Sequence, residues 1–485
     1  MFGIALPGRL SVLIVSAAIL LSVPQVYAAN SDVTSTEGWF SVVWGDGEPG
    51  SNLTAEVYTL TTPEGKTSDL LITEELARSF GGILALNRKY IAVQGRPGIA
   101  RIAGSSNSVI EVASLAIIQP PSNNGALAPE GDESAAVSGS KPWVSIMCKF
   151  SDYDDEPKNL AYFQGMYSST KPGLDHYWRE LSYNTVNIAG SDAYGWFDLP
   201  ESEAYYNPTD SLGGTNLSLL ANDCIAAADP SVDFSSYAGI NMMFNSNFDN
   251  GYAWGGSRRY SLDGVTKSFS ITWEPPWGYS SITVIAHEMG HGFGLPHSSG
   301  MYGQTYDNEW DVMSDSWANC GNSRDATYGC LGQHTIAYHK DMLGWIPADD
   351  KFITNGYNAT VIIDHLAHPS PSHYRMIKIP TDDPSYYFTV EVRMKSGYDV
   401  KLPGKGVIIH EVDRYRSRDA NVVDVDNDGD TGDEGAMFIP GETYRNTAYG
   451  FSVEVLSETA TGFQVAVIYN SFPWNLFLPT LLQGK

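Results

Sequence analysis

The sequence predicts an α+β protein in which a domain of mixed helices and strands lies between two regions built mainly of strands. Short segments that are apolar, or that alternate apolar with polar residues, dominate residues 37–118 and return after residue 351. Gly, Pro and Asn turn residues separate these segments, as expected for short β-strands. Between the two regions, strand-like and helix-compatible segments follow one another without βαβ alternation. We therefore expect an N-terminal β domain, a central α+β domain and a C-terminal β-sandwich.

Length and charge limit the class of protein. The chain has 485 residues, of which 42% are hydrophobic and 12% aromatic. At about 150 residues per domain this predicts roughly three compact units and excludes a disordered or fibrous protein. Asp and Glu number 56 against 29 Lys and Arg, giving a net charge of -27. Such an excess of acid repels nucleic-acid phosphates and anionic lipids, so nucleic acid is not an expected partner.

Residues 1–28 have the features of an export signal. Arg9 gives a basic start, an apolar run of 13 residues extends from Ser11 to Val23, and small residues end the segment at Ala28. The alternative is a membrane anchor, which needs roughly 20 apolar residues. The apolar C-terminal tail, residues 471–485, is short and interrupted by proline. We therefore expect a secreted, extracellular protein with no membrane insertion after signal cleavage; its oligomeric state is left open.

The N-terminal β domain, residues 29–118, is followed by a predicted disordered linker. Residues 119–141 are rich in Pro, Gly, Ser, Ala and acids and contain no aromatic residue, so they are expected to be open to proteolysis. The domain before them is either a propeptide or a permanent accessory domain, and both interpretations remain open. No cysteine precedes Cys148. An inhibitory propeptide would therefore act through a carboxylate or by steric cover rather than through a thiol.

The central domain is predicted over residues 142–350 and the β-sandwich over residues 351–470. The four cysteines are Cys148, Cys224, Cys320 and Cys330. An even number in an exported chain favours disulfides over a thiol site. Three pairings are possible. The short polar segment between Cys320 and Cys330 favours that pair, which leaves Cys148 with Cys224.

The strongest chemical signal is AHEMGHGFGLPH at residues 286–297. On a helix, His287 and His291 lie four residues apart and project from one face, where they can share a metal ion, and Glu288 lies beside them. Gly294 can take the left-handed conformation that ends a helix and turns the chain back. His297 can then become a third ligand.

Three imidazoles suit zinc and leave a coordination position open for water, as in catalytic sites. Glu288 can act as the general base that accepts a proton from that water and later passes it to the leaving amine. The reaction that fits is peptide-bond hydrolysis of a protein or peptide substrate. One alternative is a non-catalytic surface-binding or adhesion protein with a structural zinc, which a fourth protein ligand would favour. Another is hydrolysis of a different amide, such as a cell-wall crosslink.

The pattern His287-Glu288-x-x-His291-x-x-Gly294-x-x-His297 resembles the extended zinc motif of the metzincin metalloproteases. That family also has a methionine in a tight turn beneath the zinc, and Met313 in EWDVMS fits this position. Two branches of the family, the astacins and serralysins, carry a tyrosine two residues after the methionine. This chain has Asp315 there, so the resemblance does not support a tyrosine switch at that position.

Further segments resemble the gametolysin-like branch and the immune inhibitor A-like secreted peptidases. They are YWRELSY (177–183), WDVMS, YHKDMLGW (338–345), YDVKLPGKGVIIHEVD (398–413) and the N-terminal GWFSVVWGDG (38–47). The similarity extends over most of the mature chain. It implies a secreted zinc endopeptidase whose active-site helix lies in a cleft, between an upper sheet domain and a lower, loop-rich part that carries Met313.

A second metal site is predicted in the C-terminal region. Asp424, Asp426, Asp428 and Asp430 alternate along the chain around a glycine, as at the start of an oxygen-lined calcium loop. The glutamate usual at the twelfth position is absent, because Gly435 occupies it. The alternative is a solvated acidic loop without an ion.

Overall fold

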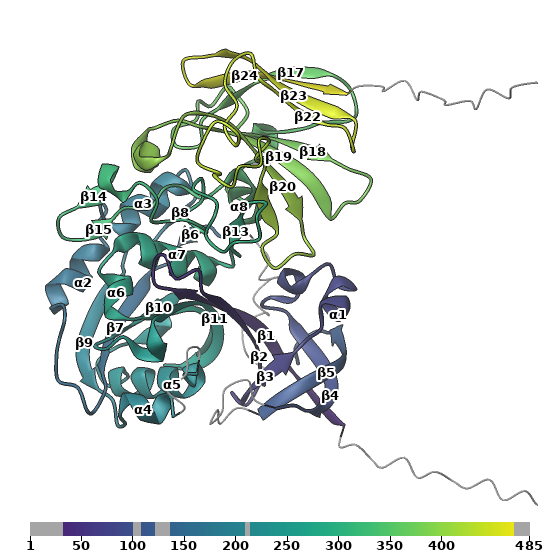
Figure 1. Ribbon diagram of the computed structural model, residues 1–485. Helices are drawn as coiled ribbons and strands as arrows, with labels where there is room; N and C mark the ends of the chain where they lie inside the picture. The colour runs from purple at the N-terminus through teal and green to yellow at the C-terminus, as the bar shows by residue number, and fades with distance from the viewer. Residues whose placement is uncertain (1–32, 100–107, 122–135, 209–213, 470–485) are drawn as a thin grey trace, which may run out of the picture.

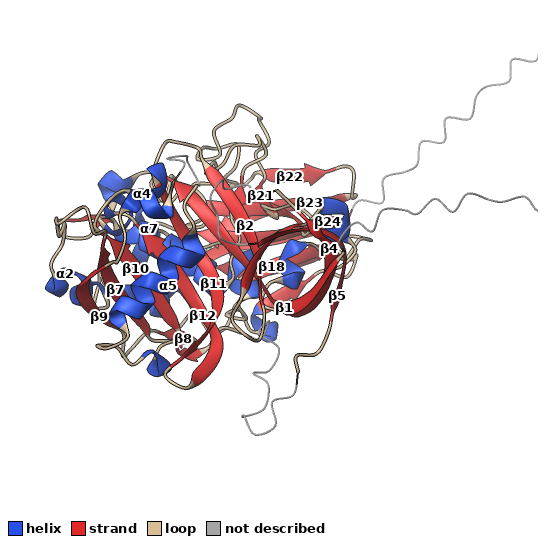
Figure 2. Cartoon of the chain, turned by 90° about the horizontal axis from the view of Figure 1, so that it is seen from below, coloured by secondary structure: helices blue, strands red, loops and turns tan. Residues whose placement is uncertain are grey.

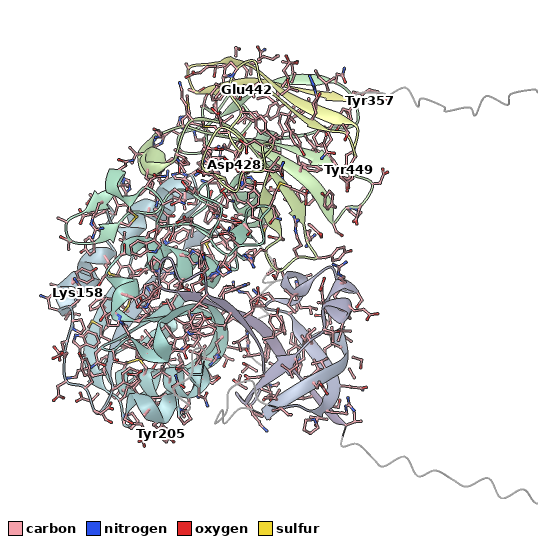
Figure 3. The ribbon with its side chains drawn as sticks, viewed as in Figure 1. Lys158, Tyr205, Tyr357, Asp428, Glu442 and Tyr449 are labelled. Atoms are coloured by element: carbon pink, nitrogen blue, oxygen red, sulfur yellow. A yellow bond between two sulfur atoms is a disulfide. The ribbon has the colours of Figure 1, made fainter. Side chains whose placement is uncertain are left out.

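The computed structural model describes residues 33–99, 108–121, 136–208 and 214–469 (Figure 1). The predicted signal (1–28), the tail (471–485) and most of the predicted linker lie outside these residues. The described part has mixed α and β structure, and strands predominate over helices (Figure 2). Side chains fill the spaces between the layers (Figure 3). No helix in the described ranges is both long enough and apolar enough to cross a membrane.

The N-terminal strands form a closed ring. They are β1 (Thr34–Gly47), β2 (Thr54–Thr61), β3 (Thr67–Leu71), β4 (Tyr90–Pro97) and β5 (Ser108–Ile117), and helix α1 (Glu74–Arg78) follows β3. Strand β1 pairs with both β2 and β4, and β3 and β5 complete the ring. Because side chains alternate along a strand, Phe40, Val42 and Trp44 point together into a core with Leu60 and Ile91.

The central region continues the same sheet. Its strands are β7 (Trp143–Lys149), β9 (Asp192–Asp198), β10 (Gly239–Phe244), β11 (Tyr252–Leu262) and β12 (Val265–Glu274). Strand β10 pairs in parallel with β7 and β12, and β11 and β12 form an antiparallel pair. The last residues of β1, 43–47, pair antiparallel with residues 252–256 of β11. The end of β1, purple in Figure 1, therefore lies between β2 of the N-terminal ring and β11 of the central region, and it joins the two parts into one sheet.

Seven α-helices of the described chain belong to the central region: α2 (Leu160–Met166), α3 (Leu174–Leu181), α4 (Glu203–Tyr206), α5 (Leu217–Ala228), α6 (Pro276–Tyr279), α7 (Ile282–Phe293) and α8 (Ala337–Met342). Helix α7 lies against β11 and β12, and its Met289 and Phe293 pack in a core with Trp143 and Trp178. One disulfide joins Cys148 on β7 to Cys224 on α5. A second joins Cys320 to Cys330, so the structure has the two pairs that the spacing favours.

Four short strands complete the central region: β6 (Gly139–Ser140), β8 (Val186–Asn187), β14 (Arg324–Asp325) and β15 (Gly329–Cys330). Strand β6 falls inside the stretch predicted as linker and pairs in parallel with β8. The pairing occurs because backbone groups of Gly139 and Lys141 donate to Thr185 and Asn187. The C-terminal end of the predicted linker is thus part of the folded central region.

The C-terminal region contains two sheets. The larger has the order β13 (Ser298–Ser299), β21 (Ala420–Val422), β20 (Gly406–Asp413), β19 (Tyr386–Arg393), β18 (Met376–Pro380), β16 (Lys351–Ile353). The smaller has the order β17 (Ala359–Asp364), β24 (Gly462–Tyr469), β23 (Phe451–Glu458), β22 (Thr443–Asn446). Both contribute to one core, with Phe388 and Val390 from the first and Val453 and Val465 from the second. Strand β13 follows His297 directly, so the larger sheet begins beside the predicted zinc motif.

Candidate metal centre

Helix α7 carries the central part of the predicted motif, and all twelve of its residues are buried. It ends at Phe293 because Gly294 adopts a left-handed conformation with φ of 101° and donates its N–H back to the last turn. The chain then reverses, and Leu295 N–H donates to the carbonyl of Gly290. This reversal returns His297 to the face of the helix that carries the other two histidines.

The three predicted imidazoles converge. The Nε2 atom of His291 lies 3.2 Å from that of His287 and 3.1 Å from that of His297. On their other edges, His287 Nδ1 lies 2.6 Å from the carbonyl oxygen of Val312, and His291 Nδ1 lies 2.7 Å from that of Leu295. These carbonyls accept hydrogen bonds from Nδ1–H, which leaves the Nε2 lone pairs free to face a common point.

A fourth group at this point was not predicted from the sequence. Asp46, near the end of β1, places Oδ1 2.6 Å from His297 Nε2 and 3.4 Å from His287 Nε2. Its Oδ2 lies 3.3 Å from His291 Nε2. The four buried side chains form a group that could hold a metal ion. Zinc–nitrogen bonds of about 2.0–2.1 Å put tetrahedral ligands roughly 3.3 Å apart. The donor set and the separations of 3.1–3.4 Å fit zinc, whereas the 2.6 Å between Asp46 Oδ1 and His297 Nε2 is a hydrogen-bond distance.

Asp46 and the histidines shift one another's pKa values. Burial raises the pKa of Asp46, but the charges of His297 and His287 and hydrogen bonds from His287 and His291 outweigh it and hold that pKa well below its usual value. Burial lowers the pKa of His291 to about 3, so this imidazole is neutral at neutral pH, as a metal ligand must be. For His287, the nearby Asp46 carboxylate outweighs burial and raises the pKa.

Glu288 lies next to the imidazoles without a partner of its own. It is fully buried, and neither carboxylate oxygen has a hydrogen-bond partner among the described residues. Burial, reinforced by the charges of Asp46 and Glu274, raises its pKa well above the usual value. Burial also raises the pKa of Glu274 to about 8. A buried carboxyl group with a raised pKa beside a metal group is a candidate for proton transfer.

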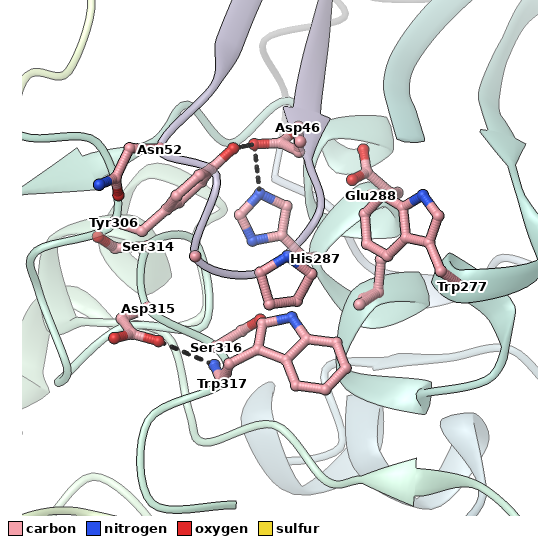
Figure 4. Close-up of a pocket in the computed structure, with 14 residues that line it drawn as sticks. Asp46, Asn52, Trp277, His287, Glu288, Tyr306, Ser314, Asp315, Ser316 and Trp317 are labelled. Carbon is pink, nitrogen blue, oxygen red and sulfur yellow. Dashed lines mark hydrogen bonds and ion pairs between the residues drawn. The ribbon is translucent and has the colours of Figure 1, made fainter. Parts of the chain in front are cut away.

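A pocket of about 120 Å³ opens beside Glu288 and His287 (Figure 4). Its apolar wall is made by Trp277, Val284 and Trp317. Its remaining lining is Asp46, Gly47, Pro49, Gly50, Asn52, Tyr306, Ser314, Asp315 and Ser316. The pocket therefore offers an apolar wall with the Glu288 carboxyl group at its edge.

Tyr306 is a second group that the sequence did not reveal. Its hydroxyl lies 2.6 Å from Asp46 Oδ1 and 2.9 Å from the carbonyl oxygen of Leu53. Burial, together with the charge of Asp46, raises its pKa well above the usual value, so it is a neutral phenol. On the other side of the site, the Trp44 ring stacks on His291 with centroids 4.8 Å apart. No local pattern marks either residue: Asp46 reaches the site through the pairing of β1 with β11, and Tyr306 lies on the irregular segment after β13.

Met313 lies beneath the helix. Gly290 faces its sulfur so closely that a Cβ at residue 290 would collide with it. The turn around Met313 is held by its own N–H, which donates to Asp311 Oδ1 at 3.1 Å, and by its carbonyl, which accepts from Ser298 N–H at 3.2 Å. The preceding residue, Val312, supplies the carbonyl that orients His287. This turn therefore supports the base of the metal group.

The predicted calcium residues separate into two sets. Asp424 and Asp426 form a second possible metal group together with Asp433, and Asp428 and Asp430 lie outside it.

The Cys320–Cys330 disulfide lies after the Met313 turn, where Cys330 N–H donates to Ser281 Oγ at the start of α7.

The chain matches no protein family and no curated protein sequence. Among solved structures, it is similar to catalytically inactive OgpA from Akkermansia muciniphila, crystallised with an O-glycopeptide (glycodrosocin) substrate. The identity is 9% and the TM-score 0.26, over 59% of this chain and 88% of that chain. A likeness of this size does not establish a shared fold.

Proposed function

We propose that this protein is a secreted zinc endopeptidase of the metzincin type, resembling the gametolysin and immune inhibitor A-like peptidases. The observation that carries the proposal is the convergence of His287, His291 and His297 with the unpartnered carboxyl group of Glu288 beside them. The tight turn of Met313 beneath the helix adds support. Two disulfides favour an oxidising extracellular location, in agreement with the expected export signal.

Each part of the site has a distinct role in this reaction. Bound zinc would supply Lewis-acid polarisation of a water molecule and of the scissile carbonyl. Glu288 accepts the proton of the attacking water, and its raised pKa favours holding that proton until it passes to the leaving amine nitrogen. The walls formed by Trp277 and Trp317 exclude water and position an apolar substrate side chain.

We further propose that the N-terminal strands keep the peptidase latent, which selects the propeptide interpretation over the accessory domain. Residues 43–47 of β1 pair with β11 beside α7, where an extended substrate could add as a strand. From this strand Asp46 takes the position next to the imidazoles that water would need. Removing the strand after cleavage within residues 119–141 would open both the edge of β11 and the metal group.

The test compares the full chain, the chain cut within residues 119–141, and the cut Glu288→Ala variant. Each is assayed on an unfolded protein substrate, with zinc quantified by elemental analysis. We expect about one zinc per chain in all three, and hydrolysis only by the cut parent chain. Equal inactivity of the cut parent and cut Glu288→Ala, both with full zinc, would contradict the peptidase.

Asp46 also favours a second candidate function. A zinc ion held by three histidines and an aspartate has the four protein ligands typical of structural sites. In that case the protein is a non-catalytic surface-binding or adhesion protein whose zinc ties the N-terminal strands to α7. The two candidates differ after the linker is cut. A structural zinc predicts that residues 33–118 stay bound and that chelation releases them, whereas a latent peptidase predicts their loss and the appearance of activity.

A further inference from the structure

Three carboxylates in the C-terminal region converge on one another, far along the chain from the histidines. Asp424, Asp426 and Asp433 each offer an oxygen within 4.8 Å of the others. Asp424 is only 2% exposed. Its Oδ2 accepts a hydrogen bond from Tyr302, but its Oδ1 has no partner among the described residues. A buried carboxylate oxygen without a partner is costly, and a bound cation would remove that cost.

The unpartnered oxygen faces its acidic neighbours across Gly435. A Cβ at residue 435 would collide with Asp424 Oδ1 and lie 2.7 Å from Asp426 Oδ1. Val425 N–H donates to the Gly435 carbonyl at 3.0 Å, which holds the two ends of the acidic loop together. The absence of a side chain at Gly435 thus leaves room for the oxygens of Asp424 and Asp426 to converge.

The alternating aspartates of the sequence motif do not all contribute. Asp428 Oδ1 accepts the N–H of Asp430 at 2.9 Å, and Asp430 Oδ1 accepts the N–H of Gly432 at 2.9 Å. Both residues are exposed, and Asp428 is labelled in Figure 3. These contacts shape the loop so that Asp433 returns to the first two carboxylates.

We propose that Asp424, Asp426 and Asp433 bind a calcium ion. The three carboxylates supply hard oxygen donors, which suit calcium rather than the nitrogen-preferring metals. Magnesium requires near-ideal octahedral geometry and keeps most of its waters, so a cluster of three side-chain carboxylates on one irregular loop suits the more adaptable calcium ion. A site of this kind in a secreted protein is expected to bind in the extracellular range of about 10⁻⁴ to 10⁻³ M.

The acidic loop also holds the segment between His297 and Met313. The Thr431 carbonyl accepts Trp310 Nε1–H at 2.8 Å, and the Thr431 hydroxyl donates to the carbonyl of Asp307. Strand β21, just before the loop, pairs in parallel with β13, which follows His297. We therefore expect calcium to order residues 298–310, which include Tyr306. This inference does not depend on peptidase activity.

The experiment uses the full chain and two matched double variants. Asp426→Asn with Asp433→Asn removes two carboxylate ligands, whereas Asp428→Asn with Asp430→Asn removes the same charge outside the cluster. In all four substitutions the amide oxygen can still accept the turn hydrogen bonds. Calcium binding is measured by calorimetry, and Tb³⁺ luminescence sensitised by Tyr302 and Trp310 reports the site directly. Hydrogen exchange of amides 298–310 is followed with and without Ca²⁺, at constant zinc content.

We expect the Asp426/Asp433 variant to bind Ca²⁺ at least about tenfold more weakly than the parent chain, and the Asp428/Asp430 variant to change by less than about twofold. Calcium should slow exchange in residues 298–310 of the parent and of the Asp428/Asp430 variant only. Circular dichroism confirms that both variants fold. No Ca²⁺ binding by the parent at millimolar concentration, or equal weakening in both variants, would overturn the proposal. Neither result would bear on zinc content or hydrolysis.

Discussion

Asp46 Oδ1 lies 2.6 Å from His297 Nε2, although 251 residues separate them in the chain. The contact exists because the end of β1, which pairs with β2 on one side, pairs its residues 43–47 with β11 on the other side, directly beside α7. A carboxylate on a strand from one region therefore completes a histidine cluster from another. Replacement of Asp46 therefore distinguishes most directly between a latent catalytic zinc site and a structural zinc site.

Asp46→Asn is expected to raise hydrolysis by the uncut chain. The amide keeps the shape of the carboxylate but loses the charge that attracts the imidazoles and a metal ion, so β1 should be released more often. We expect at least a tenfold higher initial rate on an unfolded protein substrate, which corresponds to about 1.4 kcal/mol. Zinc content should stay near one per chain, because three imidazoles remain.

Glu48→Gln is the matched control for this substitution. Glu48 is exposed and lies two residues from Asp46, so its replacement should change neither the rate nor the zinc content. Loss of zinc from the Asp46→Asn chain without any gain in hydrolysis would instead support the four-ligand structural site.

Glu288→Ala is expected to keep zinc and lose hydrolysis. Neither carboxylate oxygen of Glu288 is hydrogen-bonded to another described residue, the three histidines included. Removal of this side chain therefore leaves the metal ligands in place. General acid–base catalysis contributes typically 10²–10⁴-fold, and the turnover of the cut chain should fall by about that factor or more. Glu201→Ala, at an exposed position of the central region, is the control. An active Glu288→Ala variant would exclude Glu288 as the general base.

His297→Ala is expected to lower both zinc content and activity, because it removes one of the three convergent Nε2 atoms. Metal content after dialysis against a weak chelator, measured together with hydrolysis, checks this. His176→Ala is a suitable comparison, since His176 contacts the Tyr398 hydroxyl at 3.2 Å and takes no part in the metal group. Full zinc retention with loss of activity alone would show that His297 is not a ligand.

The local parts of the site could be predicted from the sequence. The spacing of His287 and His291 specifies one helix face, and Gly294 marks the helix end, because both depend on residues close together in the chain. The return of His297 follows from that turn. These features rely only on helix geometry, which is the same wherever the helix lies in the fold.

The remaining parts depend on pairings between distant residues. Asp46 reaches the histidines through the register of β1 with β11, and nothing in residues 38–47 specifies that partner. Likewise, Asp433 replaces Asp428 and Asp430 in the acidic cluster because successive turns in that loop change its direction. Side-chain alternation in a linear motif cannot show such turns.

Trp317→Ala is expected to reduce the preference for large apolar side chains next to the scissile bond. Trp317 forms part of the apolar wall of the pocket beside Glu288, and its removal leaves that wall open to water. Loss of contacts of this size should lower kcat/KM for a Leu- or Phe-containing peptide by roughly tenfold relative to an Ala-containing peptide. Tyr357→Ala, at a position 75% exposed, should leave this ratio unchanged. An unchanged ratio in the Trp317 variant would exclude this pocket as the specificity pocket.

The protonation of His410 is expected to link acid pH to the stability of the segment that follows His297. His410 Nε2 lies 3.2 Å from Asn308 Nδ2, which in turn lies 3.0 Å from Ser298 Oγ, so a neutral His410 accepts a hydrogen bond from the Asn308 amide in this segment. Burial lowers the pKa of His410 to about 3. The unfolded value is near 6.5, so the unfolded chain binds more protons between these two pH values. The contribution of neutral His410 to the free energy of unfolding is fully present above about pH 6.5 and decreases as the pH falls toward 3.

His410→Gln should therefore weaken the pH dependence of unfolding in the metal-free chain. Glutamine can accept the Asn308 hydrogen bond but does not titrate. In the parent, His410 lowers the free energy of unfolding by at most about 1.4 kcal/mol for each pH unit of acidification in this window, and the variant should lack this decrease. Urea unfolding at several pH values between 7 and 4 measures the slope. His373→Gln serves as the control, because His373 is partly exposed and bonded to Asp364. Parallel curves for the parent and the His410 variant would show that His410 does not couple acid to this segment.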